Sequence, residues 1–339
     1  MIFWACVSIV LGAAGAWAVA RFGGAAGLLD AAGDRSSHVG VVPKGGGVGI
    51  LAAVALVSIV SGLSWLIWLP AVAVSLVSLA GDRFDLSPAV RLAVQFACAA
   101  PAVAAALAGP FDQLSQSGQP ELLALPGYLI LVVFVVATAN FTNFMDGVNG
   151  IAGVTGLTGF GLLFFRALSL GQPALALAAL APACACLGFL PFNVPRARVF
   201  MGDAGSVLLG FLFAVLAIRL SGDPAGLAVA AAFFFPFYAD ATTTILVRRR
   251  DGERLTMAHR RHLYQLLANQ GAVAHWKVAA GYGLFQLAVG LAAMSAQNVG
   301  WVAVALVWLT AYGIFFWINR RARRWFERER PENRGNGPL

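Results

Sequence analysis

The chain has 339 residues, of which 60% are apolar and 11% are charged, and its mean hydropathy is +0.79. An average soluble domain carries about a quarter charged residues, so this composition excludes an ordinary soluble protein. The net charge of +8 does not point to nucleic acid, because most basic residues flank apolar runs, where they set membrane topology.

Apolar runs close to the roughly 20 residues of a bilayer span recur along the chain. They predict an all-α, polytopic protein of the lipid bilayer, with about eleven transmembrane helices. The expected helices are 2–20, 46–62, 64–80, 89–108, 123–139, 151–169, 172–190, 205–220, 225–246, 277–296 and 298–318. We expect residues 1–318 to form a single transmembrane catalytic domain, followed by a basic and polar tail at 319–339.

The charges predict an external N-terminus and a cytoplasmic C-terminus. In this orientation every Lys and Arg except Arg166 and Arg219 falls on the cytoplasmic side, as the positive-inside rule requires. The first apolar run has no basic residue before it, so a first span is expected rather than a cleaved signal peptide. The four cysteines fall in predicted spans and lack the spacing of a zinc or redox site.

The acidic residues also gather on this side. Eleven of the fifteen carboxylates fall in cytoplasmic segments, and only Asp240 falls within a predicted span. Five polar segments each start or end an apolar helix, so they are expected to converge on one interfacial cleft. They read DRSSHVGVVPKGGG, GDRFDLSP, NFTNFMDGVNG, FNVPRARVFMGDAGS and AHRRHLYQ.

The residue types in these segments suit a metal-bound diphosphate. Carboxylates are hard oxygen ligands, and Mg²⁺ is typically held by one or two of them together with substrate phosphates. Basic side chains donate to phosphate oxygens. Mg²⁺ is therefore the expected cofactor, with Mn²⁺ as an alternative. The acidic candidates are Asp82, Asp146 and Asp203, and the basic ones are Lys44, His259, Arg260, Arg261 and His262.

Other interpretations of the single motifs stay open. Asn and Asp at the end of a span are common caps, and Asp203 or Ser206 could cap the helix that follows. In NFTNFMDGVNG, three-residue steps do not share one narrow helix face, so we expect Gly147 and Gly150 to break the helix and form a binding loop. The glycines of GGGVG at 45–49 could cradle a phosphate, but such small residues more often allow close helix packing in membrane proteins.

In their order along the chain, RSSH, PKGGG, DRFDLS, NFTNFMDGVNG, FMGDAGS and HRRHLYQ resemble the motifs of the polyprenyl-phosphate N-acetylhexosamine-1-phosphate transferases. This family, glycosyltransferase family 4, includes the phospho-N-acetylmuramoyl-pentapeptide transferase of peptidoglycan synthesis and the enzymes that initiate O-antigen. The resemblance extends from about residue 28 to 265. It implies Mg²⁺-dependent transfer of a sugar phosphate from a UDP-N-acetyl sugar to undecaprenyl phosphate, with release of UMP, at the bacterial inner membrane.

The resemblance also implies roles for single residues. Asp203 matches the magnesium-binding aspartate, with Asp146 as a second candidate ligand, and Phe200 matches the aromatic that stacks on uracil. The remaining substrate-binding candidates are Lys44, Asn140, Asn143, Gly147, Val148, Asn149, Asn193, Arg260 and Arg261. The candidate catalytic residues are Asp82, Asp146, Asp203, His259 and His262.

The sequence departs from the family pattern at several positions. The family usually has an Asp-Asp pair before the RFDLS-like stretch, whereas this chain has Gly81 and Asp82, so that Asp85 could substitute. Asn149 stands where many relatives carry aspartate, and Lys44 where relatives usually have arginine. Asp82 is therefore expected to act as a base or as part of the metal shell.

The expected reaction is an in-line attack on the β-phosphorus of the UDP-sugar, with a covalent phospho-aspartate route as an open alternative. The spacing of the histidines in HRRHLYQ resembles the O-antigen or capsule branch. That branch implies a donor carrying N-acetylfucosamine, N-acetylquinovosamine or N-acetylglucosamine. The oligomeric state stays open between a monomer and a homodimer.

Two other functional classes compete with this expectation. A secondary transporter of an anionic substrate also suits many helices with a basic inner face, but transporters place their sites near the midplane, often in repeated halves. Among the carboxylates only Asp240 lies within a span, and no repeat is visible. A non-catalytic membrane scaffold leaves the clustering of Asp, Asn and His on one side unexplained.

Overall fold

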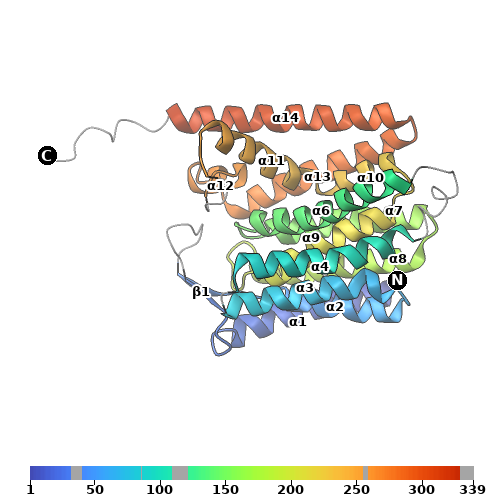
Figure 1. The fold of residues 1–339 in the computed structure, drawn as a ribbon. Coiled ribbons are helices and arrows are strands. Elements are labelled where there is room, and N and C mark those ends of the chain that lie inside the picture. The colour runs from blue at the N-terminus through green and yellow to red at the C-terminus, as the bar shows by residue number, and fades with distance from the viewer. Residues whose placement is uncertain (32–39, 85, 109–120, 255–258, 329–339) are drawn as a thin grey trace, which may run out of the picture.

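The computed structural model describes residues 1–31, 40–84, 86–108, 121–254 and 259–328. It shows a bundle of long, roughly parallel and antiparallel helices (Figure 1). The helices are α1 (Ile2–Phe22), α2 (Val48–Val60), α3 (Trp65–Phe84), α4 (Pro88–Leu107), α6 (Glu121–Met145), α7 (Ile151–Ser169), α8 (Pro173–Asn193), α9 (Gly202–Arg219), α10 (Pro224–Ala231), α11 (Phe235–Arg250), α12 (Leu263–Asn269), α13 (His275–Gln297) and α14 (Trp301–Arg328).

The composition of these helices confirms an all-α polytopic membrane protein. Among the described residues, ten helical segments are long and apolar enough to cross a membrane. The helix α2 is apolar but has only 13 residues, so it is shorter than the expected span 46–62. Large apolar side chains such as Ile130, Leu284 and Leu309 stay exposed on the outside of the bundle, as expected for surfaces that face lipid.

The helix α9 forms the centre of the bundle, and 83% of the residues in its segment are buried. It packs against α3 and α6, and glycines bring the chains close together. A Cβ atom on Gly210 would lie 2.6 Å from the carbonyl oxygen of Thr138 in α6. A Cβ atom on Gly205 would lie 2.9 Å from the Cα atom of Gly47. This close packing fixes the N-terminal end of α9, where Asp203 lies.

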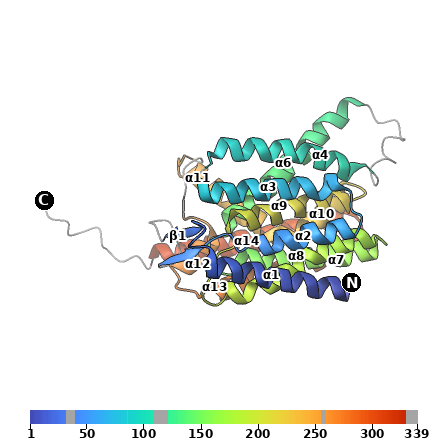
Figure 2. The ribbon, with the colours of Figure 1, turned by 90° about the horizontal axis from the view of Figure 1, so that it is seen from below.

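A small antiparallel hairpin, which the sequence did not predict, lies at one end of the bundle. Its strands are β1 (Leu29–Ala31) and β2 (Val41–Pro43). The chain after β2 continues into a parallel bridge between Lys44 and Phe200. Figures 1 and 2 both show β1 at the same end as α12, opposite the N-terminus.

Several helix boundaries differ from the expected ones. The expected span 225–246 lies within one candidate membrane span, Pro224–Arg250, but a 3-10 turn at Ala232–Phe234 divides it into α10 and α11, which has Pro236 in its first turn. Proline lacks an N–H and cannot continue the helical ladder from the preceding turn. The short α12 was not expected. The last helix, α14, continues unbroken beyond residue 318 to Arg328. The expected division into a domain at 1–318 and a tail at 319–339 stays a prediction.

Candidate active site

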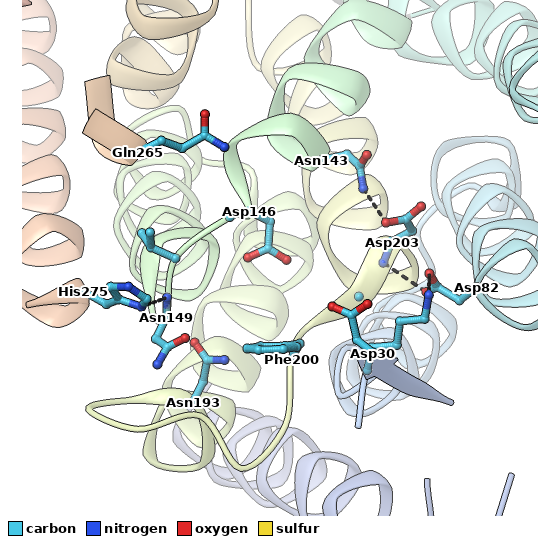
Figure 3. A pocket seen from close by; sticks show the side chains of 14 residues that line it. Asp30, Asp82, Asn143, Asp146, Asn149, Asn193, Phe200, Asp203, Gln265 and His275 are labelled. Carbon is cyan, nitrogen blue, oxygen red and sulfur yellow. Dashed lines mark hydrogen bonds and ion pairs between the residues drawn. The ribbon is translucent and has the colours of Figure 1, made fainter. Parts of the chain in front are cut away.

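One cavity of about 320 Å³ lies at the end of the bundle that carries β1 and α12 (Figure 3). Polar segments far apart in the sequence meet in it. The lining residues are Asp30, Lys44, Asp82, Asn143, Asp146, Gly147, Val148, Asn149, Asn193, Phe200, Gly202, Asp203, Gln265 and His275. The volume is within the range of about 300–1,000 Å³ that is typical of small-molecule sites.

Asp203 lies in the first turn of α9 and is held from two sides. Its carboxylate accepts hydrogen bonds from Asn143 Nδ2 at 2.8 Å and from Arg91 Nη1 at 2.5 Å. Asn143 lies in the last turns of α6, and its amide also donates to Ser206 Oγ at 3.1 Å. These contacts aim the carboxylate at a fixed position in the cavity wall.

Asp82 supports the same helix end from α3. Its Oδ2 accepts a hydrogen bond from the backbone N–H of Asp203 at 3.1 Å, so Asp82 satisfies one of the open donors at the start of α9. Neither Asp203 nor Ser206 caps α9 with its own side chain, which corrects that interpretation. Lys44 Nζ lies 3.4 Å from Asp82 Oδ1 and balances one negative charge.

Asp146 follows directly after the end of α6 and points into the middle of the cavity (Figure 3). Burial, and after it the negative charges of Asp203 and Asp82, together raise the pKa of this carboxyl from 3.8 to about 7. The carboxylates of the cavity therefore repel one another. A bound cation would relieve this repulsion.

Gly81 explains how Arg91 reaches Asp203. A Cβ atom on Gly81 would lie 2.8 Å from Arg91 Nε and 3.0 Å from its Cζ. The guanidinium instead occupies this space, where it also donates to the backbone carbonyls of Gly81 and Leu86. Gly81, which stands where the resemblance predicts an aspartate, thus makes room for a positive charge beside Asp203.

The other side of the cavity is aromatic and amidic. The ring of Phe200 lies at the floor of the cavity (Figure 3), and its backbone is fixed on both sides. The N–H of Phe200 donates to the carbonyl of Pro43, and its carbonyl accepts from the N–H of Gly46, each at 2.8 Å. A ring held in this way presents a rigid stacking surface for a planar ligand.

The loop after Asp146 is shaped by glycine and asparagine. Gly150 has a φ of +89°, a conformation that favours glycine. Asn193 Oδ1 accepts from the N–H of Gly150, and Asn193 Nδ2 donates to the carbonyl of Val199 at 2.9 Å. His275 Nδ1 accepts from the N–H of Asn149 at 3.4 Å. The expected end of the helix in NFTNFMDGVNG is confirmed, although α6 continues through Met145.

The donor set fits a divalent cation that shares its ligands with a substrate. Asp146 and Asp203 line the same cavity, near the amide of Asn143. Within the described part of the chain, no three His, Cys, Asp or Glu side chains could hold a metal ion by themselves. Two carboxylates plus substrate oxygens and water are the arrangement that Mg²⁺ commonly uses.

The cavity does not include all of the residues expected there. Asn140 Nδ2 donates to Gln95 Oε1 at 2.6 Å and to the carbonyl of Val136, so its amide is engaged away from the cavity. The stretch from His259 to His262 does not line the cavity either: Arg261 pairs with Asp251 at 2.6 Å, and the buried His262 faces Asp240. Their expected roles at the sugar and phosphates stay predictions. Asp85 lies outside the described residues.

Four residues of the site were missed by sequence reasoning. Asp30, Gln265 and His275 line the cavity, and Arg91 pairs with Asp203. Asp30 and Gln265 lie in or beside polar segments on the expected side, which is a usable signal. His275 and Arg91 lie in the first turns of long helices, where a charged or polar residue ordinarily indicates only the membrane boundary.

The family model of glycosyl transferase family 4 matches residues 64–221. The matched part of the chain supplies most of the cavity, including the three central aspartates.

Named relatives agree with the family. Over 197 residues the chain is 24% identical to a probable undecaprenyl-phosphate N-acetylglucosaminyl 1-phosphate transferase of Bacillus subtilis, covering 57% of this chain and 55% of the relative. Over 97 residues it is 32% identical to a phospho-N-acetylmuramoyl-pentapeptide-transferase of Staphylococcus aureus, covering 28% of this chain and 30% of the relative. The chain thus spans about half, or less, of the length of these relatives.

Proposed function

We propose that the protein transfers an N-acetylhexosamine 1-phosphate from a UDP-sugar to undecaprenyl phosphate, giving undecaprenyl-diphospho-sugar and UMP. The observation that carries the proposal is the cavity that joins three aspartates to the fixed ring of Phe200, at the end of an apolar helix bundle. The named relatives, one of which acts on undecaprenyl phosphate by its printed name, support the same reaction class.

The two sides of the cavity suit the two halves of a nucleotide diphosphate sugar. Phe200 offers a face for the uracil ring, while the amides of Asn149 and Asn193 border the same region and suit its polar edge. The diphosphate then lies towards Lys44, Asp146 and Asp203. The length of the cavity thus separates a base-recognition end from a charged reaction end.

The second substrate combines a charged head with a long apolar tail. Exposed apolar side chains flank the charged end of the cavity: Phe84 is 67% exposed just after Asp82, and Phe144 is 56% exposed just before Asp146. A polyprenyl tail lying against these surfaces in the bilayer would place its phosphate beside the aspartates. A lipid phosphate as the second substrate would explain why a polar cavity lies at a membrane boundary.

The proposed step is a phosphoryl transfer. A phosphate oxygen of the lipid attacks the β-phosphorus, the bond from this phosphorus to the bridging oxygen breaks, and UMP leaves with the electron pair. When bound, Mg²⁺ would supply charge neutralisation for the diphosphate, and Asp146 and Asp203 are the residues that would hold it. Asp82 fixes the start of α9, and Lys44 and Arg91 supply fixed positive charge beside the carboxylates.

We extend the proposal to the location and the pathway class. The predicted topology places the cavity at the cytoplasmic face of the inner membrane, where UDP-sugars are made. The HRRHLYQ motif supports initiation of O-antigen or a related cell-envelope polysaccharide. A UDP-linked N-acetylfucosamine, N-acetylquinovosamine or N-acetylglucosamine is then the donor.

A donor labelled with ³²P at the β-phosphate tests the reaction directly. The purified protein in liposomes with undecaprenyl phosphate and Mg²⁺ should move the label into the lipid and release unlabelled UMP. Asp203→Asn and chelation by EDTA should each abolish the transfer. Asp223→Asn is the matched control, because Asp223 caps α10 at the other end of the bundle and Asn preserves a cap.

The same assay separates the alternatives. Labelled donor that enters the liposomes without UMP release would instead identify a transporter. Label that appears in neither the lipid nor the lumen, with a full panel of UDP-sugars, would contradict the proposed reaction.

A further inference from the structure

Asp240 is a fully buried carboxylate inside the membrane-spanning segment Pro224–Arg250. It does not line the cavity, and the proposed reaction does not use it. A charged group at such a position is costly and ordinarily has a specific role. Its partners indicate what that role is.

Donors from three parts of the chain converge on this carboxylate. Tyr282 Oη in α13 donates to it at 2.6 Å, and Thr244 Oγ1, one turn further along α11, donates at 3.1 Å. The backbone N–H groups of Leu263 and Tyr264 donate at 2.9 and 3.3 Å. Asp240 therefore anchors the N-terminus of α12, a helix of only seven residues, to α11 and α13.

The anchored helix carries two residues to the cavity. Gln265 lines the cavity itself. Tyr264 Oη donates to the carbonyl of Phe144 at 2.9 Å, in the last turn of α6. The side chain of Tyr264 also lies tightly against Gly147, because a Cβ atom there would be 2.3 Å from Tyr264 Oη. Tyr264 thus contacts Phe144 and Gly147, which lie on either side of Asp146 in the sequence.

We infer that Asp240 is a positioning residue, which acts through α12 and Tyr264 to hold Asp146 and its loop in place. The path runs from the Asp240 carboxylate to the backbone of Leu263 and Tyr264, and from Tyr264 Oη to Phe144. Asp240 itself does not line the cavity.

His262 also helps to hold α12 in place. Its Nδ1 lies 3.4 Å from Asp240 Oδ1, and its ring is stacked on Tyr264 with ring centroids 5.6 Å apart. The backbone N–H of His262 donates to Gln265 Oε1 at 3.3 Å. The second histidine of the HRRHLYQ motif therefore helps to hold α12, rather than reaching into the cavity.

Hydrogen–deuterium exchange of the full-length protein tests this path without any substrate. Tyr264→Phe removes only the hydroxyl that bonds Phe144, and Asp240→Asn removes one anionic acceptor at the start of α12. We expect amides in the peptide 145–151 to exchange about five-fold faster or more in both variants, as expected for the loss of one hydrogen bond. Tyr238→Phe is the matched control, because its hydroxyl is also buried but bonds Thr138. It should leave this peptide unchanged.

A kinetic measurement tests the same path, but it rests on the proposed function and is therefore interpreted separately from the exchange experiment. Tyr264→Phe should raise KM for the UDP-sugar and the Mg²⁺ concentration for half-maximal activity, whereas Tyr238→Phe should change neither. Unchanged exchange in Tyr264→Phe would overturn the positioning role, even if the wild-type protein transfers sugar phosphate. An inactive wild-type protein in which Tyr264→Phe still loosens the loop would overturn the proposed function alone.

Discussion

Both ends of the helix bundle contain buried charged side chains, but the two ends differ in the partners that surround these charges. At the end opposite the cavity, the guanidinium of the buried Arg166 donates to the carbonyls of Leu220 and Gly226 and to the side chain of Gln297. At the cavity end, Asp146 faces two more carboxylates, Asp82 and Asp203. The first arrangement is complete within the protein, whereas the second collects like charges that a ligand would balance. Lys44 and Arg91 pair with Asp82 and Asp203, so Asp146 is the member of these three carboxylates that the described part of the chain leaves uncompensated.

The largest expected effect comes from removing one of these like charges. Asp203→Asn should lower kcat by at least on the order of 10³-fold, because the cation that would neutralise the transferred phosphate loses a carboxylate ligand. The measurement is transfer of labelled sugar phosphate by purified protein. Substantial activity in Asp203→Asn would show that these three carboxylates are not the reactive centre.

The raised pKa of Asp146 predicts that both stability and Mg²⁺ affinity depend on pH. The pKa of this carboxyl is raised to about 7, so the folded protein holds the proton more tightly than the unfolded chain. Its contribution to stability is therefore fully present below about pH 4 and is lost as the pH rises through about 7. Cation binding needs the ionised form, so the apparent Mg²⁺ affinity should rise about ten-fold between about pH 6 and about pH 8.

Thermal unfolding during Mg²⁺ titration at the two pH values measures this change. Asp146→Asn should flatten the pH dependence of the affinity. An equal affinity at both pH values in the wild-type protein would contradict a role for Asp146 as a ligand.

Arg166→Met tests the opposite end. The substitution leaves the carbonyls of Leu220 and Gly226 without this donor, at a cost of about 1–3 kcal/mol for each buried polar group. We expect a melting temperature lower by several degrees with kcat of the folded protein unchanged. A loss of kcat without a loss of stability would instead indicate a functional site at this end.

The smallest effect concerns the charge balance beside Asp203. Gly81→Ala should displace Arg91, because the new Cβ atom lies within 2.8 Å of Arg91 Nε. The cation then no longer competes with Arg91, so we expect Mg²⁺ to bind a few-fold more tightly. Gly161→Ala is the control, since nothing lies within 4 Å of a Cβ atom there. Weaker or unchanged Mg²⁺ binding in Gly81→Ala would contradict this competition.

Much of the fold could be predicted, because long apolar runs determine where helices cross a bilayer. The gathering of Asp82, Asp146 and Asp203 could also be predicted, since their motifs lie on one side of the predicted topology. The break between α10 and α11 and the short α12 could not, because they depend on packing and on donors to Asp240 from distant segments.

The contrast between Asn140 and Asn143 shows the limit most clearly. Both lie in one motif, but the rotation of a helix over three residues turns Asn140 towards Gln95 in α4 and Asn143 towards Asp203 in α9. The sequence indicates which residue types are present, while the neighbouring helices decide which of them face the cavity.

The backbone junction between Pro43, Gly46 and Phe200 has a consequence for biogenesis. The segment that holds the aromatic floor is synthesised early, whereas Phe200 leaves the ribosome only after about 150 further residues. Until then, the backbone groups of Pro43 and Gly46 that bond Phe200 lack this partner. The proposed nucleotide site is thus a late product of assembly, and a nascent chain that stalls before α9 lacks the Phe200 ring that would form it.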